Sequence, residues 1–296
     1  MKNLKYLFLL AAVAFSCSDD DEKSDYTDGC KLLGLTETHS AAANNPCAIA
    51  VSQAGYIAIS EYNGGYGTLA KIRIYTSYDN FKNGMVKTEL TAVSPEAMVF
   101  DSDNNLYVSE TEQIAGIKVF DHIGDGAFNH KKTIQDNFNN PRGLAFDAQG
   151  RLYMANDGTG QIFKFDDPFN SNAHVSIGSW LTGIKGLAIN GNIMYVANYI
   201  TNVVTRNILK SDGTLERIDD SLTLAKATDI SVNGNTIVVT SHDNSTITVF
   251  SNCDFSDENK SNYSDKGKIF GTAFLNSGSI LAADFGSDKA KIFNLQ

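Results

Sequence analysis

The chain has 296 residues, of which 42% are hydrophobic and 20% are charged, which is enough apolar material for an ample globular core. The formal net charge is −10, and no basic stripe offsets it. Nucleic-acid binding needs basic side chains that displace counterions from phosphates, so we expect no nucleic-acid partner.

The first 16 residues have the layout of a secretory signal peptide. Two lysines precede an apolar run over residues 7–15, which is shorter than the roughly 20 residues that span a bilayer. The run ends in AFSC, which resembles a bacterial lipobox and predicts lipidation of Cys17. Ala14 stands where Leu is usual and Phe15 is bulky, so a plain secretory leader with an incidental cysteine stays open.

Residues 17–30 are interpreted as an acidic tether. The sequence SDDDE follows Cys17, and such a solvated run would hold a folded body away from an anionic membrane. It also resembles the acidic signal that sends some Gram-negative lipoproteins to the outer face of the outer membrane. We therefore expect an exported, surface-exposed outer-membrane lipoprotein that reaches its membrane partner through an N-terminal lipid anchor.

Three further cysteines, Cys30, Cys47 and Cys253, allow at most one disulfide. The strand placement given below puts Cys30 and Cys253 toward the outer part of one face and Cys47 near the axis. This favours a Cys30–Cys253 pair, with three unpaired buried thiols as the alternative. The sequence has no CxxC motif and no histidine at metal-ligand spacing, so we expect no cysteine metal site.

Six copies of one segment follow, each an apolar run, a polar turn and a second apolar run. They start at Pro46, Pro95, Pro141, Ile184, Ala227 and Ile269, which are 42 to 49 residues apart. Spacings of this size are typical of β-propeller blades. No linker interrupts the copies, so residues 31–296 are predicted to form one domain.

Each copy predicts four antiparallel strands. In the third copy, residues 144–147 and 152–155 form a hairpin, and residues 162–165 follow as a third strand. Candidates for outer, fourth strands are residues 86–90, 132–135 and 215–218.

The last blade needs a strand from elsewhere in the chain. The third strand of the sixth copy is followed directly by Gln296, the last residue of the sequence. Without a fourth strand, the outer edge of that third strand would be unpaired. Residues 31–38 are the only apolar segment free to fill it, so we expect them to pair beside residues 292–295. The predicted fold is an all-β, six-bladed propeller of four-stranded antiparallel blades, closed by this N-terminal strand.

A column of mostly small residues, the small column, lies two positions after each start. Its members are Ala48, Ala97, Gly143, Gly186, Asp229 and Gly271. First strands converge on the axis of a propeller, where larger side chains would collide. With the repeated motifs P-x-[GA]-[LMI]-x-[FV] and [LI]-Y-[VM]-[AS]-[DEN], this pattern resembles the NHL-repeat family and the wider six-bladed group of gluconolactonase and senescence-marker-protein hydrolases. The resemblance covers residues 46–296.

The resemblance implies a divalent cation in the central channel, held by side chains directly before the small column. Those positions are occupied here by Cys47, Glu96, Arg142, Lys185, Thr228 and Phe270. Only Glu96 is a suitable calcium ligand, and Arg142 and Lys185 would repel a cation. We therefore expect no cofactor, with Glu96 and Asp229 as the channel residues where Ca²⁺ could still bind.

A second set of polar residues, the strand-end ring, closes the second strands. Its members are Glu61, Glu110, Asn156, Asn198, Ser241 and Asp284. We expect this ring to surround the channel mouth, where its oxygens could bind calcium or sugar hydroxyls, with Tyr62, Tyr199 and His242 beside them. Alternatively, these side chains bond backbone groups in the next turn. Arg142 and Lys185 would make an anionic or zwitterionic ligand as acceptable as a cation.

Two functions remain open from the sequence. The first is a non-catalytic surface lipoprotein that binds a glycan, peptide or protein at the mouth. The second is a calcium-dependent lactonase-like or esterase-like hydrolase, or a lyase, with a rearranged site of Glu61, Glu110, Asp229 and Asp284. The sequence has no G-x-S-x-G, H-E-x-x-H or P-loop motif, which favours the first.

Overall fold

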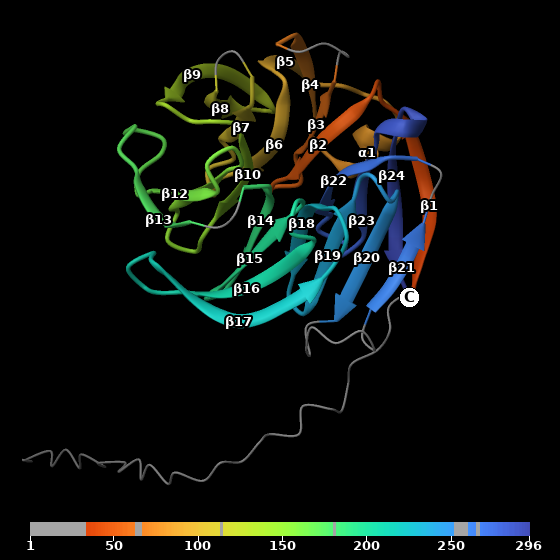
Figure 1. Ribbon diagram of the computed structural model, residues 1–296. Coiled ribbons are helices and arrows are strands. Elements are labelled where there is room, and N and C mark those ends of the chain that lie inside the picture. Colours follow the sequence, from red (N-terminus) through yellow and green to blue (C-terminus); the bar gives the residue numbers. More distant parts are fainter. Residues whose placement is uncertain (1–33, 63–66, 113–114, 180–181, 252–259, 265–266) are drawn as a thin grey trace, which may run out of the picture.

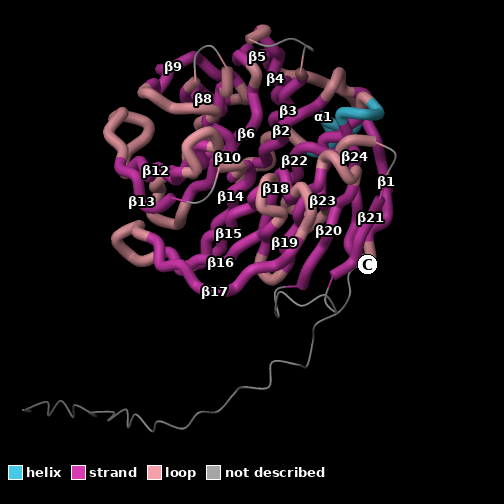
Figure 2. Tube along the Cα trace, in the orientation of Figure 1, coloured by secondary structure: helices cyan, strands magenta, loops and turns pink. Residues whose placement is uncertain are grey.

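The computed structural model describes residues 34–62, 67–112, 115–179, 182–251, 260–264 and 267–296. They form six four-stranded antiparallel sheets arranged as blades around a central axis (Figure 1), which confirms the six-bladed propeller. Figure 2 shows the ring as almost entirely strand, and α1 (Tyr78–Lys82) is the one α-helix in these ranges. The predicted signal peptide, tether and lipidation site, and Cys30 and Cys253, lie outside the described residues.

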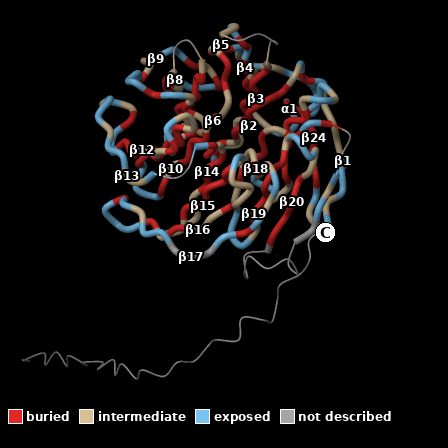
Figure 3. The backbone as a smooth tube through the Cα atoms, viewed as in Figure 1, coloured by how far each residue is buried: buried red, intermediate tan, exposed pale blue. Residues whose placement is uncertain are grey.

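The inner half of each blade is a hairpin of two strands. The first strands are β2 (Pro46–Val51), β6 (Pro95–Phe100), β10 (Pro141–Phe146), β14 (Ile184–Asn190), β18 (Ala227–Asn233) and β22 (Ile269–Phe274). The second strands are β3 (Ile57–Glu61), β7 (Leu106–Glu110), β11 (Leu152–Asn156), β15 (Ile193–Asn198), β19 (Thr236–Ser241) and β23 (Ile280–Asp284). Buried residues gather in these inner strands (Figure 3), because each blade covers the faces of its neighbours.

The outer half of each blade is a more exposed pair. The third strands are β4 (Leu69–Tyr75), β8 (Gly116–Gly124), β12 (Gln161–Phe165), β16 (Val203–Leu209), β20 (Thr246–Ser251) and β24 (Lys289–Leu295). The fourth strands are β5 (Thr88–Val93), β9 (Ala127–Gln135), β13 (Val175–Ser179), β17 (Leu215–Thr223), β21 (Lys260–Ser264) and β1 (Leu35–Ala42). No helix within the described ranges is long and apolar enough to cross a bilayer.

The N-terminal strand closes the ring, as expected. β1 pairs antiparallel with β24, with Leu35 opposite Leu295 and Ala42 opposite Lys289, and Figure 1 shows the two side by side. The strand extends four residues beyond the predicted end at residue 38. It covers the outer edge of β24, which would otherwise present unpaired backbone groups.

All six first strands carry an irregularity at the small column. The register with the second strand shifts there in every blade, as a β-bulge does when it re-aims the side chains around it. Space is tight at this point, because a Cβ on Gly186 would lie 2.9 Å from the Cα of Asp229. A Cβ on Gly143 would lie 2.6 Å from the carbonyl oxygen of Lys185. The small residues therefore let neighbouring first strands approach each other.

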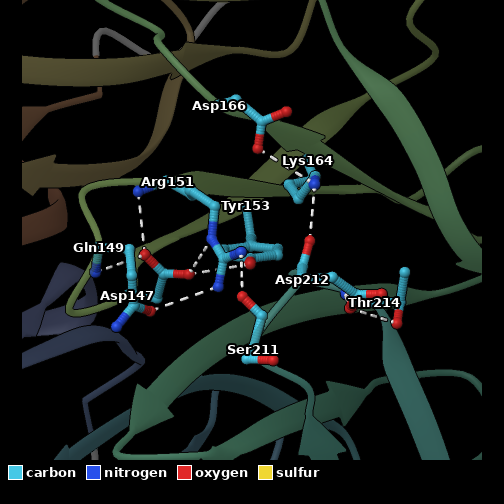
Figure 4. Close-up of polar contacts among 9 residues, drawn as sticks. All are labelled: Asp147, Gln149, Arg151, Tyr153, Lys164, Asp166, Ser211, Asp212 and Thr214. Atoms are coloured by element: carbon cyan, nitrogen blue, oxygen red, sulfur yellow. Dashed lines mark hydrogen bonds and ion pairs between the residues drawn. The ribbon is translucent and has the colours of Figure 1, made fainter.

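Polar contacts also fix one blade against the next, as Figure 4 shows for blades 3 and 4. Arg151 Nε lies 2.6 Å from the Asp147 carboxylate, and its Nη1 donates to the carbonyl of Ser211 at 2.8 Å. Lys164 Nζ donates to the carbonyl of Asp212 at 2.9 Å. Both carbonyls belong to the turn between β16 and β17, so the side chains of one blade hold a turn of the next.

Candidate functional site

A cavity of about 300 Å³ lies on the propeller axis and is lined by the first strands of all six blades. We call its end where these strands begin the mouth. Six equivalent side chains line the cavity there, and we call them the mouth column: Cys47, Glu96, Arg142, Lys185, Thr228 and Phe270. The six residues are all of different types.

The charged wall of the mouth is organised by Arg142. Its Nη1 lies 2.7 Å from Glu96 Oε2, and its Nε donates to Asp157 Oδ2 at 3.0 Å. Glu96 precedes Arg142 by one blade, and Asp157 follows the second strand of the Arg142 blade. Each of the three side chains is only partly exposed, which strengthens the attraction between their charges.

Lys185, on the next blade, lies over an aromatic ring. Its Nζ is 3.7 Å from the centroid of Tyr199, and Lys226 Nζ is 4.2 Å from the same centroid. The Tyr199 hydroxyl donates to Asp243, whose other oxygen lies 2.8 Å from His242 Nδ1. Burial and the neighbouring Arg142 lower the pKa of Lys185. Within the described chain, no carboxylate lies at ion-pair distance from this ammonium.

The facing wall is aromatic. Phe270 lies between His242 and Phe285, with centroid separations of 3.9 Å and 5.4 Å. Tyr62 continues the row, 6.0 Å from Phe285. Cys47 lies beside Phe270, and burial raises the pKa of its thiol well above the usual value, so this wall carries no charge in the cavity lining. Such rings offer faces for stacking or apolar contact.

Asp229 lines the cavity beyond the mouth column. Its Oδ2 accepts the backbone N–H of Thr272 at 2.8 Å, a bond that ties the first strand of blade 5 to that of blade 6. Burial raises the pKa of Asp229 to about 6, although the backbone bonds act in the opposite direction. Both residues assigned to the channel from the sequence, Glu96 and Asp229, are thus cavity residues.

The strand-end ring lies elsewhere. All six of its side chains are buried, and none lines the cavity. Glu61, Glu110 and Asn156 accept backbone N–H groups from the chain just before it enters their blades, at 3.2, 2.7 and 2.8 Å. The Ser241 hydroxyl donates to the carbonyl of Ala225 at 2.7 Å.

The remaining two members of the ring bond the turn that follows them. Asn198 Oδ1 accepts from Thr201 at 2.9 Å, and Asp284 Oδ1 accepts from Ser287 at 3.2 Å, at the start of the 3-10 helix η2 (Phe285–Ser287). The expectation that the ring surrounds the mouth therefore differs from the structure. The side chains that end the second strands point toward neighbouring loops, where orphan backbone groups need partners.

The residues named for a rearranged calcium site do not come together. Asp229 lines the cavity, whereas Glu61, Glu110 and Asp284 have their partners inside their own blades. Across the described ranges, no group of three or more His, Cys, Asp and Glu side chains is arranged to hold a metal ion. Cys47 is a free, buried cysteine, and the predicted Cys30–Cys253 pair lies outside those ranges.

Comparison with known proteins finds similarity in the fold. A solved structure described as streptogramin B lyase superimposes with a TM-score of 0.59 and 13% sequence identity, covering 89% of this chain and 98% of that one. The likeness is one of architecture. No protein-family model matches the chain, and no curated protein matches it.

Sequence reasoning overlooked several residues in and around the mouth. Lys226 and Asp243, which bracket Tyr199, were not singled out, and Phe270 was considered only as a residue unable to bind metal. One signal was available for Phe270, because it is the only aromatic member of the mouth column. The contacts of Lys226 and Asp243 depend on loop conformation, which the repeat pattern does not specify.

Proposed function

We propose that this protein is a non-catalytic binding propeller that captures a glycan, a peptide or a segment of a protein at the mouth. The observation that carries the proposal is the contrast between two neighbouring columns. The small column is nearly uniform because every blade makes the same close contact there, whereas the mouth column differs in every blade. In a repeat fold, residues that serve the scaffold recur, and a site for one ligand needs residues that do not.

The size of the cavity fits this role. Ligand pockets enclose roughly 300–1,000 Å³, so a cavity of about 300 Å³ admits a small ligand or the tip of a larger one. The aromatic wall supplies contact area, and the charged wall supplies orientation. The calcium-dependent hydrolase or lyase has less support, because three of its four residues are engaged inside their blades.

The N-terminus completes the proposal. Cys17 would carry the lipid, and residues 17–30 would connect the outer membrane to the closure strand β1. The propeller would then be displayed at the cell surface, where a binding module meets ligands from outside. The likeness of the repeats to the NHL and gluconolactonase group bears on the scaffold and adds no catalytic step.

The test is a glycan and peptide array probed with the lipid-free protein and with the double variant Lys185→Ala/Phe270→Ala. We expect a set of ligands that the wild type binds and that the double variant loses. Ile123→Ala is the matched control, because Ile123 is 56% exposed near the far end of β8. Arrays on which wild type and double variant give the same signals, or no signal at all, would overturn the proposal.

A further inference from the structure

The two walls of the mouth define a narrower ligand class, an inference that rests on the proposed function. We propose that the mouth binds a small ligand with one carboxylate and one aromatic or branched apolar group. The carboxylate contacts Lys185 and Arg142, and the apolar group packs on Phe270. The ligand is either a free organic acid or the C-terminus of a peptide, which present the same chemistry.

The first support is that the ammonium of Lys185 has no acidic partner in the described part of the chain. Lys185 lines the cavity, and its ammonium lies 3.7 Å from the ring centroid of Tyr199 and lacks a carboxylate partner within the described residues. Lys226 lies over the same ring but does not line the cavity. Glu96, Asp157 and Asp243 are the nearby acids, but each already has a partner in Arg142, Tyr199 or His242. A ligand carboxylate would supply the missing counter-charge.

The second support is the orientation of Arg142. Glu96 and Asp157 occupy its Nη1 and Nε and so fix the plane of the guanidinium. Nη2 makes no hydrogen bond with another described residue, and a guanidinium is a donor at every nitrogen. Arg142 and Lys185 hold equivalent positions on the neighbouring strands β10 and β14. Together they can bind the two oxygens of one carboxylate.

The third support is what faces this pair. In a ring of six blades, blade 3 faces blade 6 and blade 4 faces blade 1, so Arg142 faces Phe270 and Lys185 faces Cys47. A charged wall opposite an aromatic and neutral wall orients a ligand that is polar at one end. The cavity volume limits such a ligand to about one ring with a short linker.

The experiment is calorimetric titration with matched acid and amide probes. These are 3-phenylpropionate, 4-methylpentanoate and the tripeptide Ala-Ala-Phe, each against its primary amide. We expect the acids to bind about tenfold or more tighter than the amides, as the loss of a charge-assisted bond implies. The relative strength of the organic acids and the tripeptide identifies the source of the carboxylate.

Three variants assign the contacts. Lys185→Met should weaken acid binding about tenfold and remove most of the acid preference. Lys226→Met is the matched control, because Lys226 contacts the same ring but does not line the cavity, and it should keep the preference. Phe270→Ala should weaken acids and amides alike. Thermal unfolding of each variant verifies that it is folded.

Three sets of results would overturn the inference. Equal or tighter binding of the amides, or equal losses in Lys185→Met and Lys226→Met, would remove the carboxylate assignment while leaving a binding mouth. If no probe binds at millimolar concentration but the arrays detect ligands for the wild type, the ligand class is wrong and the proposed function stands. If neither the arrays nor the calorimetric titrations detect binding, both proposals are contradicted.

Discussion

The carboxylate of Asp284 lies 2.7 Å from the ammonium of Lys291, and the two side chains are 0% and 8% exposed. Asp284 ends β23, and Lys291 lies opposite Ala282 on β24. The same arrangement recurs in the two blades that follow around the ring. Its members there are Glu61 with Arg73 at 3.1 Å and Glu110 with Lys118 at 3.8 Å.

In the other three blades, uncharged residues occupy both the position of the carboxylate and the position of the cation. Their second strands end in Asn156, Asn198 and Ser241, and the residues in the position of Lys291 are Phe163, Thr205 and Thr248. A carboxylate thus occurs only where the third strand supplies a cation. An uncompensated buried charge is strongly destabilising, which explains why the two positions change as a pair.

Removing one partner of the Asp284–Lys291 pair should therefore cost more than removing both. We expect Asp284→Asn and Lys291→Thr each to lower the free energy of unfolding by about 3–5 kcal/mol. The double variant reproduces the Asn198 and Thr205 combination of blade 4 and should regain most of that loss. Urea denaturation of the four proteins gives the coupling energy, and additive losses would contradict the pairing.

The glycine positions of the small column should not tolerate a methyl group. In Gly186→Ala the new Cβ would lie 2.9 Å from the backbone of blade 5, and overpacking of this kind costs about 1–3 kcal/mol. Gly34→Ala is the control, because its Cβ would meet only Gln296 at 4.0 Å. Thermal unfolding should show a clear drop for the first variant and little change for the second, and equal melting temperatures would argue against close strand packing.

Asp229 should make the stability depend on pH. Its folded pKa of about 6 is above the ordinary 3.8, so the native state favours the protonated form. The stabilisation that the protonated Asp229 side chain contributes is fully present below about pH 4 and is lost as the pH rises through 6. Asp229→Asn lacks the ionisation but keeps an oxygen for the Thr272 N–H. The free energy of unfolding of the variant, measured relative to wild type, should therefore rise by up to about 3 kcal/mol between pH 4 and pH 7.

Urea denaturation of both proteins across that pH range measures the difference. Asp243→Asn is a suitable comparison, since Asp243 is exposed and its pKa is lowered, first by the hydrogen bond from Tyr199. Its difference from wild type should stay nearly constant above pH 4, because a carboxyl group with a lowered pKa titrates below that range. A pH-independent difference for Asp229→Asn would show that the carboxyl group is ionised normally.

The closure strand should be required for folding, whereas the residues before it should not. A chain that starts at residue 34 retains β1 and should melt at the same temperature as the mature protein. A chain that starts at residue 43 lacks all eight residues of β1 and exposes the edge of β24. We expect this form to aggregate or to melt at least several degrees lower, as size-exclusion chromatography and calorimetry would show.

The blades were predictable because their inner strands repeat. Leu152–Asn156 and its equivalents are buried throughout, and the turn that precedes them carries a residue at positive φ, such as Gly150 or Gly191. The outer strands lack this signal. Val175–Ser179 was not predicted because none of its residues is buried, and the predicted strand at 86–90 is observed at Thr88–Val93.

The short helix α1 was missed for a similar reason. Its five residues span little more than one turn, and only Phe81 is buried. At the site, the mouth column followed from the position of the repeat starts. The strand-end ring was assigned two possible roles, since a sequence does not show whether a carboxylate at a strand end faces the axis or a loop. Comparing each ring residue with its third-strand partner, such as Arg73 against Thr205, would have given the necessary signal.

The two ends of the described chain meet in the structure. Gly34 and Gln296 exchange backbone hydrogen bonds, with N···O distances of 3.2 Å and 3.0 Å. The polypeptide therefore describes a nearly closed loop in which no blade is first by geometry. A short linker could join the ends, and a new start could be opened at an exposed hairpin turn such as Gly191, with every wall of the mouth kept in place. The order of the blades around the mouth is therefore independent of where the chain begins.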